Sequence, residues 1–529
     1  MIDRSPQVRT VSAAALRRML ADGQELAILD LREELIFSQG HLLHARSLPL
    51  SRLELRIASL VPRRGTRIVL VDEADGLAER AAAILSGFGY TDVAILDGGV
   101  AAWEAAGLEL FSGVNVPSKA FGEFVEHESG TPSIDAHELD ALLREGADLV
   151  VLDSRPFDEY TRVSIPTATN VPGAELVLRV RDLAPSPATT VVVNCAGRTR
   201  SIIGAQSLID AGVPNKVVAL RNGTMGWNLA GLACESGRER RASSVSGGTL
   251  AWARAAAEKV ARKYGVERID GATLARWRNE RETGSLYVFD VRDPAEYAAG
   301  HVAGVASAPG GQLVQATDQY VGTLGARIVL VDDKEVRAVM TASWLRRMGW
   351  KDVFVLAEPG METGWPTPAV LGAEPRPDLR IGVDELAARL AGGEATVVDL
   401  SLSRDYRQGH IPGAWFAIRA RLARALTVIP LRGTLVLTSE DGVLAGIAAP
   451  EACGLTETPV RYLAGGNAAW QAAGHALSTE EKMADEPVDL WLKPYERPGG
   501  TADAMAEYLA WETDLLPRMA RDGSTDFHV

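Results

Sequence analysis

An apolar run that ends in aspartate recurs four times along this chain, and no other feature of the sequence constrains its fold as much. The four copies are LAILDLR, LVVLDSR, YVFDVR and TVVDLS, in which the aspartates are Asp30, Asp153, Asp290 and Asp399. An aromatic residue follows each aspartate after seven positions, at Phe37, Tyr160, Tyr297 and Tyr406. Short apolar runs of this kind are typical of buried strands. Four copies in one register indicate four repeats of a single folding unit.

A second apolar run follows in each copy, as RIVLVD, TVVVNC, RIVLVD and TLVLTS. The intervals from Asp30 to Asp72, Asp153 to Cys195 and Asp290 to Asp332 are each 42 residues, and the interval from Asp399 to Thr438 is 39. We call this point of each repeat the strand-end position. The sequence alignment assigns it to Asp72, Cys195, Asp332 and Thr438, so the second repeat alone places a thiol there.

Each repeat continues with a third short strand and a helix, and the four helices carry Trp103, Trp227, Trp365 and Trp470. Strands that alternate with helices favour parallel pairing through right-handed crossovers, which covers both faces of a sheet with helices. The predicted fold class is therefore α/β. We place the four domains at residues 8–112, 130–236, 264–368 and 378–478, and a C-terminal helical arm at 479–529 that docks on the repeats or on a partner subunit.

Composition excludes several classes of protein. A chain of 529 residues is too long for one hydrophobic core, and a net charge of -14 argues against non-specific binding to nucleic acid. The N-terminus lacks the apolar segment of a signal peptide, and no run of about 18 apolar residues could span a membrane. We therefore expect a cytoplasmic protein that binds neither nucleic acid nor membrane, and we leave open whether it forms a homodimer.

Three cysteines, Cys195, Cys234 and Cys453, are too few and too scattered for a disulfide framework. They form no CxxC pair, and the eight histidines show no ligand spacing, so we expect neither a metal nor another cofactor. Cys195 opens the loop Cys-Ala-Gly-Arg-Thr-Arg-Ser, ahead of a helix expected to begin near Ile202. Backbone N–H groups, a helix N-terminus and nearby arginines stabilise a thiolate, which is the nucleophilic form of cysteine. Cys195 is therefore the predicted catalytic residue.

The segments DVRDPAEYAAGHVAGV and DLSLSRDYRQGHIPGA resemble the rhodanese pattern of Asp-x-Arg, an aromatic residue and Gly-His-Ile-Pro-Gly-Ala. The second strand, the cysteine loop and the Gly-x-x-x-Trp ending are similar to that family as well. The resemblance implies four tandem rhodanese-like domains, of which the second is active and the other three are inactive. The second copy lacks the Gly-His pair that is present at Gly40-His41, Gly300-His301 and Gly409-His410.

The activity implied by the resemblance is that of a thiosulfate sulfurtransferase-like enzyme. Sulfane sulfur would pass from thiosulfate or a similar anion, through a Cys195 persulfide, to a thiol, cyanide or a protein, with ping-pong kinetics. The loop would cradle the sulfur through its backbone N–H groups, and its arginines would attract the donor; these residues are Ala196, Gly197, Arg198, Thr199, Arg200 and Ser201. Asp-x-Arg also recurs in repeats without the thiol, so Asp153 and Arg155 are predicted to orient and hold the fold.

Two other functions remain as alternatives. One is a scaffold or sulfur-relay protein whose inactive repeats dock partners, and the other is a cysteine-dependent phosphatase or arsenate reductase of related fold. The resemblance associates Cys-x5-Arg with a phosphate-sized loop, whereas Cys195 and Arg200 form the shorter Cys-x4-Arg. The loops after Asp72 and Asp332 carry acids where the active loop carries arginines, so cysteine alone at either position is not expected to restore activity. Cys234 and Cys453 are interpreted as structural, with Cys234 the alternative candidate for a resolving thiol.

Overall fold

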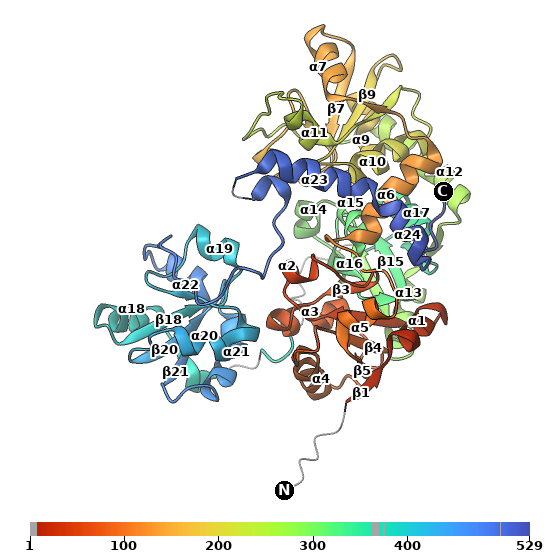
Figure 1. Cartoon of the computed structure of the whole chain (residues 1–529). Helices are drawn as coiled ribbons and strands as arrows, with labels where there is room; N and C mark the ends of the chain where they lie inside the picture. The colour runs from red at the N-terminus through yellow and green to blue at the C-terminus, as the bar shows by residue number, and fades with distance from the viewer. Residues whose placement is uncertain (1–7, 361–369, 374–375, 498) are drawn as a thin grey trace.

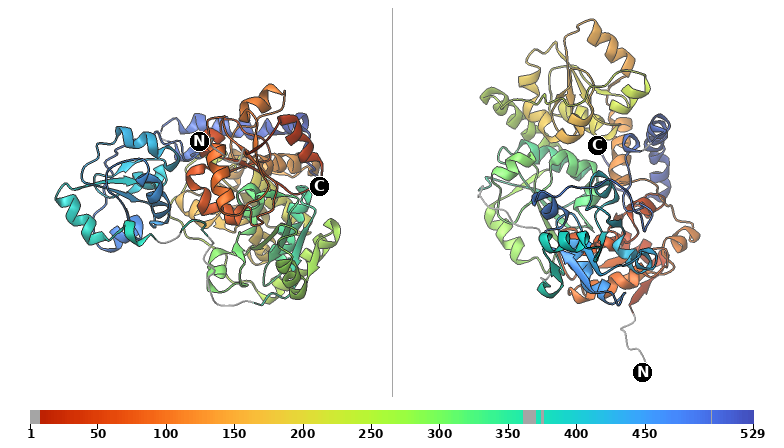
Figure 2. Two further views of the ribbon diagram at one scale, coloured as in Figure 1. Left: turned by 90° about the horizontal axis from the view of Figure 1, so that it is seen from below. Right: turned by 90° about the vertical axis from the view of Figure 1, so that its left-hand side faces the viewer.

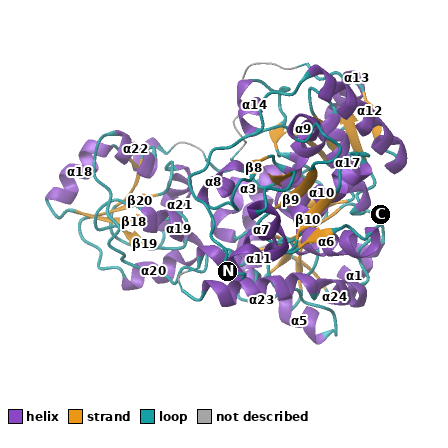
Figure 3. Cartoon of the chain, turned by 90° about the horizontal axis from the view of Figure 1, so that it is seen from above, coloured by secondary structure: helices purple, strands orange, loops and turns teal. Residues whose placement is uncertain are grey.

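A computed structural model describes residues 8–360, 370–373, 376–497 and 499–529, and each repeat in it forms a parallel sheet of five strands (Figure 1). Counted in order within a repeat, the strands lie side by side as first, fifth, fourth, second and third. Figure 3 shows the strands enclosed between helices. The predicted α/β class with four tandem parallel sheets is confirmed.

The first two repeats share one order of elements. The strands of the first are β1 (Arg9–Val11), β2 (Leu26–Asp30), β3 (Ala45–Ser47), β4 (Ile68–Val71) and β5 (Val93–Leu96). Its helices are α1 (Ala13–Ala21), α2 (Glu34–Phe37), α3 (Leu53–Leu60), α4 (Leu77–Gly87) and α5 (Gly99–Ala105), and α6 (Val116–Ser129) leads to the second repeat. The strands of the second are β6 (Ser133–Ile134), β7 (Leu149–Asp153), β8 (Thr169–Asn170), β9 (Thr190–Asn194) and β10 (Val217–Leu220). Its helices are α7 (Ala136–Arg144), α8 (Phe157–Arg162), α9 (Leu176–Leu183), α10 (Thr199–Asp210) and α11 (Gly223–Leu229).

The third repeat follows the long helix α12 (Gly247–Tyr264). The strands of its own sheet are β11 (Glu267–Ile269), β12 (Leu286–Asp290), β13 (Ala306–Ser307), β15 (Arg327–Val331) and β16 (Val353–Leu356). A further short strand before β15, β14 (Thr323–Leu324), belongs to the sheet of the first repeat. Its helices are α13 (Gly271–Asn279), α14 (Pro294–Ala299), α15 (Gly310–Gln315), α16 (Thr317–Tyr320) and α17 (Val336–Arg347). The predicted helix around Trp365 lies outside the described residues.

The fourth repeat and the arm complete the chain. The strands are β17 (Arg380–Ile381), β18 (Ala395–Asp399), β19 (Trp415–Phe416), β20 (Thr434–Thr438) and β21 (Val460–Leu463). The helices are α18 (Val383–Ala391), α19 (Ser403–Gln408), α20 (Leu422–Val428), α21 (Val443–Cys453) and α22 (Gly466–Ala472). The arm contains the short 3-10 helix Pro494–Glu496, α23 (Thr501–Thr513) and α24 (Leu515–Asp522).

The apolar runs form strands because both of their faces are buried. In β2, Ala27 and Leu29 belong to one hydrophobic cluster and Leu26 and Ile28 to another, since successive side chains of a strand point to opposite faces. A continuous apolar run therefore fits a sheet that has helices on both sides.

The repeats pack on one another and are not independent domains joined only by linkers. A single hydrophobic cluster spans the second repeat, α12 and the third repeat. The short strand β14, which belongs to the third repeat in sequence, joins the first sheet, where Thr323 pairs with Ala27 in the antiparallel sense. The fourth repeat forms a lobe at one side of the molecule (Figures 1 and 2), and its buried Arg419 pairs with Glu54 of the first repeat at 2.5 Å.

The Gly-His pair has a structural role that explains why the second repeat can lack it. His41 stacks on Phe37 with 3.9 Å between ring centroids, and His410 stacks on Tyr406 in the same way. The backbone of His41 pairs with Phe111 and so ties the end of the repeat to its beginning. Ser164 occupies this place in the second repeat and makes the same backbone pairing, with Glu235. The pairing therefore needs no imidazole.

Burial of His41 predicts a pH-dependent stability for the first repeat. Burial lowers the pKa of His41 to about 4, so the imidazole is neutral in the folded protein, whereas in the unfolded chain its pKa is about 6.5. The resulting stability is complete above about pH 6.5 and is lost as the pH falls toward 4, by up to about 3 kcal/mol. Thermal unfolding of His41→Gln should show a weaker loss over this pH range than the wild type. Parallel profiles for the two proteins would contradict the assignment.

Candidate active site

Cys195 follows the last residue of β9, at the carboxyl edge of the second sheet. Its side chain is only 2% exposed, and its thiol donates to the Ser201 hydroxyl at 3.5 Å. Ser201 in turn donates to the carbonyl of Arg198 at 2.8 Å. The helix α10 begins at Thr199, three residues earlier than predicted, so the helix N-terminus lies closer to the sulfur than the sequence indicated.

The carbonyl groups of the cysteine loop are held away from the sulfur by the next helix. The N–H of Thr224 donates to the Cys195 carbonyl at 2.8 Å, and the N–H of Met225 donates to the Ala196 carbonyl at 2.9 Å. This close approach requires Gly223, because a Cβ atom there would lie 2.3 Å from the Cys195 oxygen. Because the loop carbonyls point toward α11, the loop N–H groups can point toward the sulfur of Cys195.

In the repeats that have no cysteine at the strand-end position, a different side chain there forms hydrogen bonds with the loop that follows. In the first repeat, the carboxylate of Asp72 accepts the N–H groups of Ala74 and Ala78 at 2.9 and 3.0 Å. In the third repeat, Asp332 accepts the N–H groups of Lys334 and Arg337 at 3.1 and 2.8 Å. The strand-end side chain is thus an acceptor for N–H groups of the following loop in both repeats.

The assignment of the fourth strand-end position to Thr438 is wrong by one residue. Thr438 pairs with Asp399 inside the sheet, just as Asn194, the residue before Cys195, pairs with Asp153. Ser439 is therefore the structural counterpart of Cys195, and its hydroxyl accepts the N–H of Ala445 at 3.3 Å. The fourth repeat is shorter between its two central strands, and alignment by the apolar run alone conceals the shift.

Arg198 is already neutralised. Its guanidinium donates twice to Glu123 of α6, at 2.7 Å each, and also contacts Glu126. It also donates to the Asn222 side chain at 3.1 Å. Arg198 therefore fastens the cysteine loop to the connecting helix α6.

Arg200 is paired as well, with Glu159 of α8 at 2.8 Å and with the Gln312 side chain at 3.0 Å. Lys493 of the arm reaches the same carboxylate at 2.9 Å. Burial alone would raise the pKa of Glu159, but the positive charges of Arg200 and Lys493 outweigh it and hold that pKa well below its usual range. Glu159 thus carries a negative charge between two cations.

The third repeat retains an arginine that the sequence analysis overlooked. Arg337 lies five residues after Asp332, as Arg200 lies five after Cys195. It pairs with Asp332 at 2.8 Å and with Glu296, the counterpart of Glu159. The statement that the inactive loops carry acids in place of arginines is therefore wrong for this repeat, whose arginine faces an internal carboxylate.

Asp153 and Arg155 form a buried ion pair with a distance of 2.7 Å. Arg155 also donates to the carbonyl of Val163, and Asp153 accepts from the side chain of Asn194, the residue before Cys195. Equivalent pairs join Asp30 to Arg32 and Asp290 to Arg292. The pair lies outside the cavity described next, and its orienting role stays a prediction.

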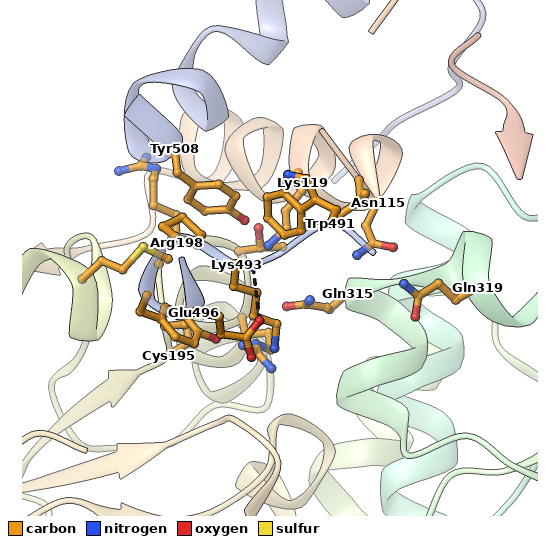
Figure 4. A pocket seen from close by; sticks show the side chains of 18 of the residues that line it. Asn115, Lys119, Cys195, Arg198, Gln315, Gln319, Trp491, Lys493, Glu496 and Tyr508 are labelled. Atoms are coloured by element: carbon orange, nitrogen blue, oxygen red, sulfur yellow. Dashed lines mark hydrogen bonds between the residues drawn. The ribbon is translucent and has the colours of Figure 1, made fainter. Parts of the chain in front are cut away.

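A cavity of about 220 Å³ opens above Cys195, and every repeat contributes to its wall. Its lining includes Glu34 of the first repeat, Gln315 of the third, Arg404 of the fourth and Lys493 of the arm. Figure 4 shows Cys195, Lys493 and Gln315 around the same space, with Asn115 and Lys119 approaching from α6. Sequence reasoning missed these residues because they lie outside the repeat that carries the cysteine.

Most of the charged side chains that line the cavity are basic. Two acidic residues face five basic ones, which are Lys119, Arg198, Arg200, Arg404 and Lys493. The carboxylates that pair with the loop arginines, Glu123 and Glu159, stand behind them and do not line the cavity. Each of the five basic residues is paired with a carboxylate, Lys119 with Glu512 and Arg404 with Asp405 among them. The cavity therefore presents cationic hydrogen-bond donors whose charge is balanced by nearby carboxylates.

The other two cysteines lie elsewhere. Cys453 is exposed at the end of α21, and Cys234 packs beside the core of the second repeat, where burial raises the pKa of its thiol. Neither lines the cavity at Cys195. Within the described ranges, no group of three or more histidine, cysteine or acidic side chains is placed to hold a metal. No helix there is long and apolar enough to cross a membrane.

Comparisons with known proteins agree with this architecture. Residues 12–106, 135–230, 273–361 and 382–473 each match the Rhodanese-like domain family. A crystal structure of thiosulfate sulfurtransferase from Pseudomonas aeruginosa superposes with a TM-score of 0.94 at 47% identity, over 99% of this chain and 100% of that one.

Two curated relatives match in part. A probable 3-mercaptopyruvate sulfurtransferase from Pseudomonas aeruginosa is 35% identical over 130 residues, which is 24% of this chain and 45% of that protein. A helix-turn-helix-type transcriptional regulator from Mycobacterium tuberculosis is 32% identical over 94 residues, which is 18% of this chain and 41% of that protein. The matches thus span less than half the length of either curated relative.

Four parallel sheets with one cysteine loop define a tandem rhodanese-like protein, and this chain belongs to the Rhodanese-like domain family. The relative that spans it from end to end is a thiosulfate sulfurtransferase. The prediction of a rhodanese-type sulfurtransferase is confirmed at the level of the enzyme class.

The buried arginine of the third repeat provides a test of its structural role. Arg337→Met leaves the buried carboxylate of Asp332 without its cation and should lower the free energy of unfolding by about 3–5 kcal/mol. Lys334→Met is the matched control on the same loop; Lys334 is partly exposed, and its loss should cost less than about 1 kcal/mol. Urea unfolding followed by tryptophan fluorescence measures both. Equal losses would show that the buried network does not stabilise the repeat.

Proposed function

We propose that the protein transfers sulfane sulfur from an anionic donor, of which thiosulfate is the simplest, through a persulfide on Cys195. The observation that carries the proposal is a thiol on the floor of a cavity whose lining has five basic and two acidic side chains. The guanidinium and ammonium groups that line the cavity can donate charge-assisted hydrogen bonds to an anionic donor. The nucleophile that the chemistry requires is then in place.

The inactive repeats support a cradle for the transferred sulfur. Asp72 and Asp332 show that the loop after the second strand offers N–H groups to an acceptor at the strand-end position. The loop from Ala196 to Ser201 starts its helix four residues after Cys195, as α17 does after Asp332. We infer that its N–H groups stabilise the thiolate and the outer sulfur of the persulfide.

The reaction balances without a cofactor. The Cys195 thiolate attacks the outer sulfur of thiosulfate, a new S–S bond forms, and sulfite leaves with the electron pair of the bond that breaks. An acceptor thiolate then attacks the outer sulfur of the persulfide, and the electron pair of that bond returns to Cys195. Neither step requires protonation of a leaving group, so the absence of Gly-His in the second repeat is tolerated.

The paired arginines then have a positioning role in addition to their charge. Arg198 is held by Glu123 and Arg200 by Glu159, so neither side chain needs to reorganise when the donor enters. Fixed charges of this kind stabilise a developing anion with little reorganisation. Donor affinity is therefore expected to depend on Glu159 and Lys493 as well as on the arginines.

Persulfide formation tests this proposal directly. After incubation with thiosulfate, mass spectrometry should find one added sulfur atom on the peptide that contains Cys195, with release of sulfite. Cys195→Ser should abolish both and lower turnover by at least about a thousandfold, because the nucleophile is lost.

The other two cysteines supply the controls. Cys453→Ser and Cys234→Ser should retain sulfur loading and turnover, since neither thiol lines the cavity. Phosphate esters and arsenate, offered to the same preparation, should not be turned over. Equal loading of wild type and Cys195→Ser would overturn the assignment of the site, and loading of neither would overturn the activity.

A further inference from the structure

We infer that the acceptor of the sulfur is a low-molecular-weight thiol, and that the C-terminal arm excludes protein thiols from Cys195. This inference rests on the proposed function and adds the substrate class of its second half-reaction. It starts from the burial of the cysteine: with only 2% of the residue exposed, an attacking sulfur must come through the cavity.

The arm covers the cysteine loop at van der Waals distance. A Cβ atom on Gly197 would lie 3.1 Å from the Glu512 carboxylate and 3.6 Å from the Tyr508 ring. Beside it, Met505 and Leu509 of α23 close an apolar cluster with Ala196 and Met225. Figure 1 shows α23 lying across the second repeat next to α6. There is no room between arm and loop for a protein surface.

The arm is anchored by a core of its own. The Trp511 ring packs on Gly113, where a Cβ atom would approach it to 2.4 Å, and the indole N–H donates to the Ser112 carbonyl at 3.1 Å. Leu515 and Met519 of α24 are buried against Phe111. Undocking the arm would expose these apolar side chains to water, so the covered state is favoured.

The cavity that remains suits a small molecule. Its volume of about 220 Å³ is well above the ~10–15 Å³ that one water needs, and below the ~300–1,000 Å³ of sites for drug-sized ligands. The wall opposite Cys195 carries the amide side chains of Gln315 and Asn115 (Figure 4). The amide oxygen of Asn115 is buried and has no hydrogen-bond partner among the residues described. A small thiol with polar groups on its non-reacting end fits this wall.

The transfer step is the second half-reaction already described. The acceptor thiolate forms an S–S bond with the outer sulfur while the bond from that sulfur to Cys195 breaks. The acceptor leaves as a persulfide and Cys195 returns as a thiolate, with no external oxidant or reductant. The attacking sulfur must lie in line with the breaking bond, which a surface cysteine of a folded protein cannot reach under the arm.

Thiol labelling with reagents of different size tests the exclusion, and the chain supplies its own control. Iodoacetamide should label Cys195 and the exposed Cys453, whereas a polyethylene glycol maleimide should label Cys453 and react with Cys195 at least about a hundredfold more slowly. Rapid labelling of Cys195 by the polymer reagent would overturn the inference. The labelling requires no turnover, so its result is independent of the sulfurtransferase assay.

Persulfide transfer tests the substrate class. Wild-type protein loaded with thiosulfate and freed of excess donor should pass its sulfur to cysteine or glutathione, and at least about a hundredfold more slowly to a small folded protein with one surface cysteine. Trp511→Ala should raise transfer to the protein thiol and polymer labelling of Cys195 by about a hundredfold, because it removes the anchor of the arm. Trp277→Ala, which removes a tryptophan that packs on Phe354 in the third repeat, should change neither.

A variant of Gln315 tests whether the wall opposite Cys195 binds the acceptor. Gln315→Ala should raise the KM for glutathione about five- to tenfold, because a hydrogen bond from the amide to the acceptor is lost. Transfer to the protein thiol at the glutathione rate would overturn the inference while leaving the Cys195 persulfide intact. Failure of loading itself would instead overturn the proposed function.

Discussion

Backbone N–H groups in the loop after the second central strand need an acceptor, and three of the four repeats supply one from a side chain at the strand-end position. The first and third repeats supply a carboxylate, Asp72 or Asp332, and the fourth supplies the hydroxyl of Ser439. These acceptors belong to the chain and satisfy the loop permanently. In the second repeat Cys195 occupies this position, and its thiol donates to the hydroxyl of Ser201. Buried polar groups are costly when unpaired, so the same loop is stabilised by an aspartate and is available for chemistry with a cysteine.

Charge at the site is arranged in two layers. The basic side chains line the cavity, and the carboxylates that fix them stand behind, as Glu123 does for Arg198 and Glu159 for Arg200. Single buried cations would be unfavourable, and the pairs offset that cost while the guanidinium and ammonium groups remain along the cavity. The third repeat keeps this arrangement around Arg337 but replaces the sulfur with Asp332, so the arginine is satisfied by its own chain. Its retained arginine is consistent with a repeat that has kept the scaffold of the site and lost the nucleophile.

Tandem repetition and the arm turn a shallow strand-end loop into an enclosed cavity. An isolated repeat would present Cys195 at the edge of its sheet, as expected for ligand sites of open α/β folds. Here α6, α15 and the arm close over that edge, and the fourth repeat contributes Arg404. All four of these wall segments lie outside the second repeat. The rest of the chain therefore shapes the cavity at Cys195.

The sequence by itself determined the repeat, the α/β class and the position of Cys195 at the end of a buried strand, because hydrophobic periodicity and residue spacing are local properties of the chain. It located the fourth strand-end position one residue early, at Thr438 instead of Ser439, since a shorter connection shifts the register without changing the apolar run. It also passed over Arg337 and Glu159, whose partners are distant in sequence. Only the tertiary structure decided which cations are neutralised, how deeply Cys195 is buried and which residues face it. Those properties arise where four repeats and the arm meet, and no single segment of sequence contains them.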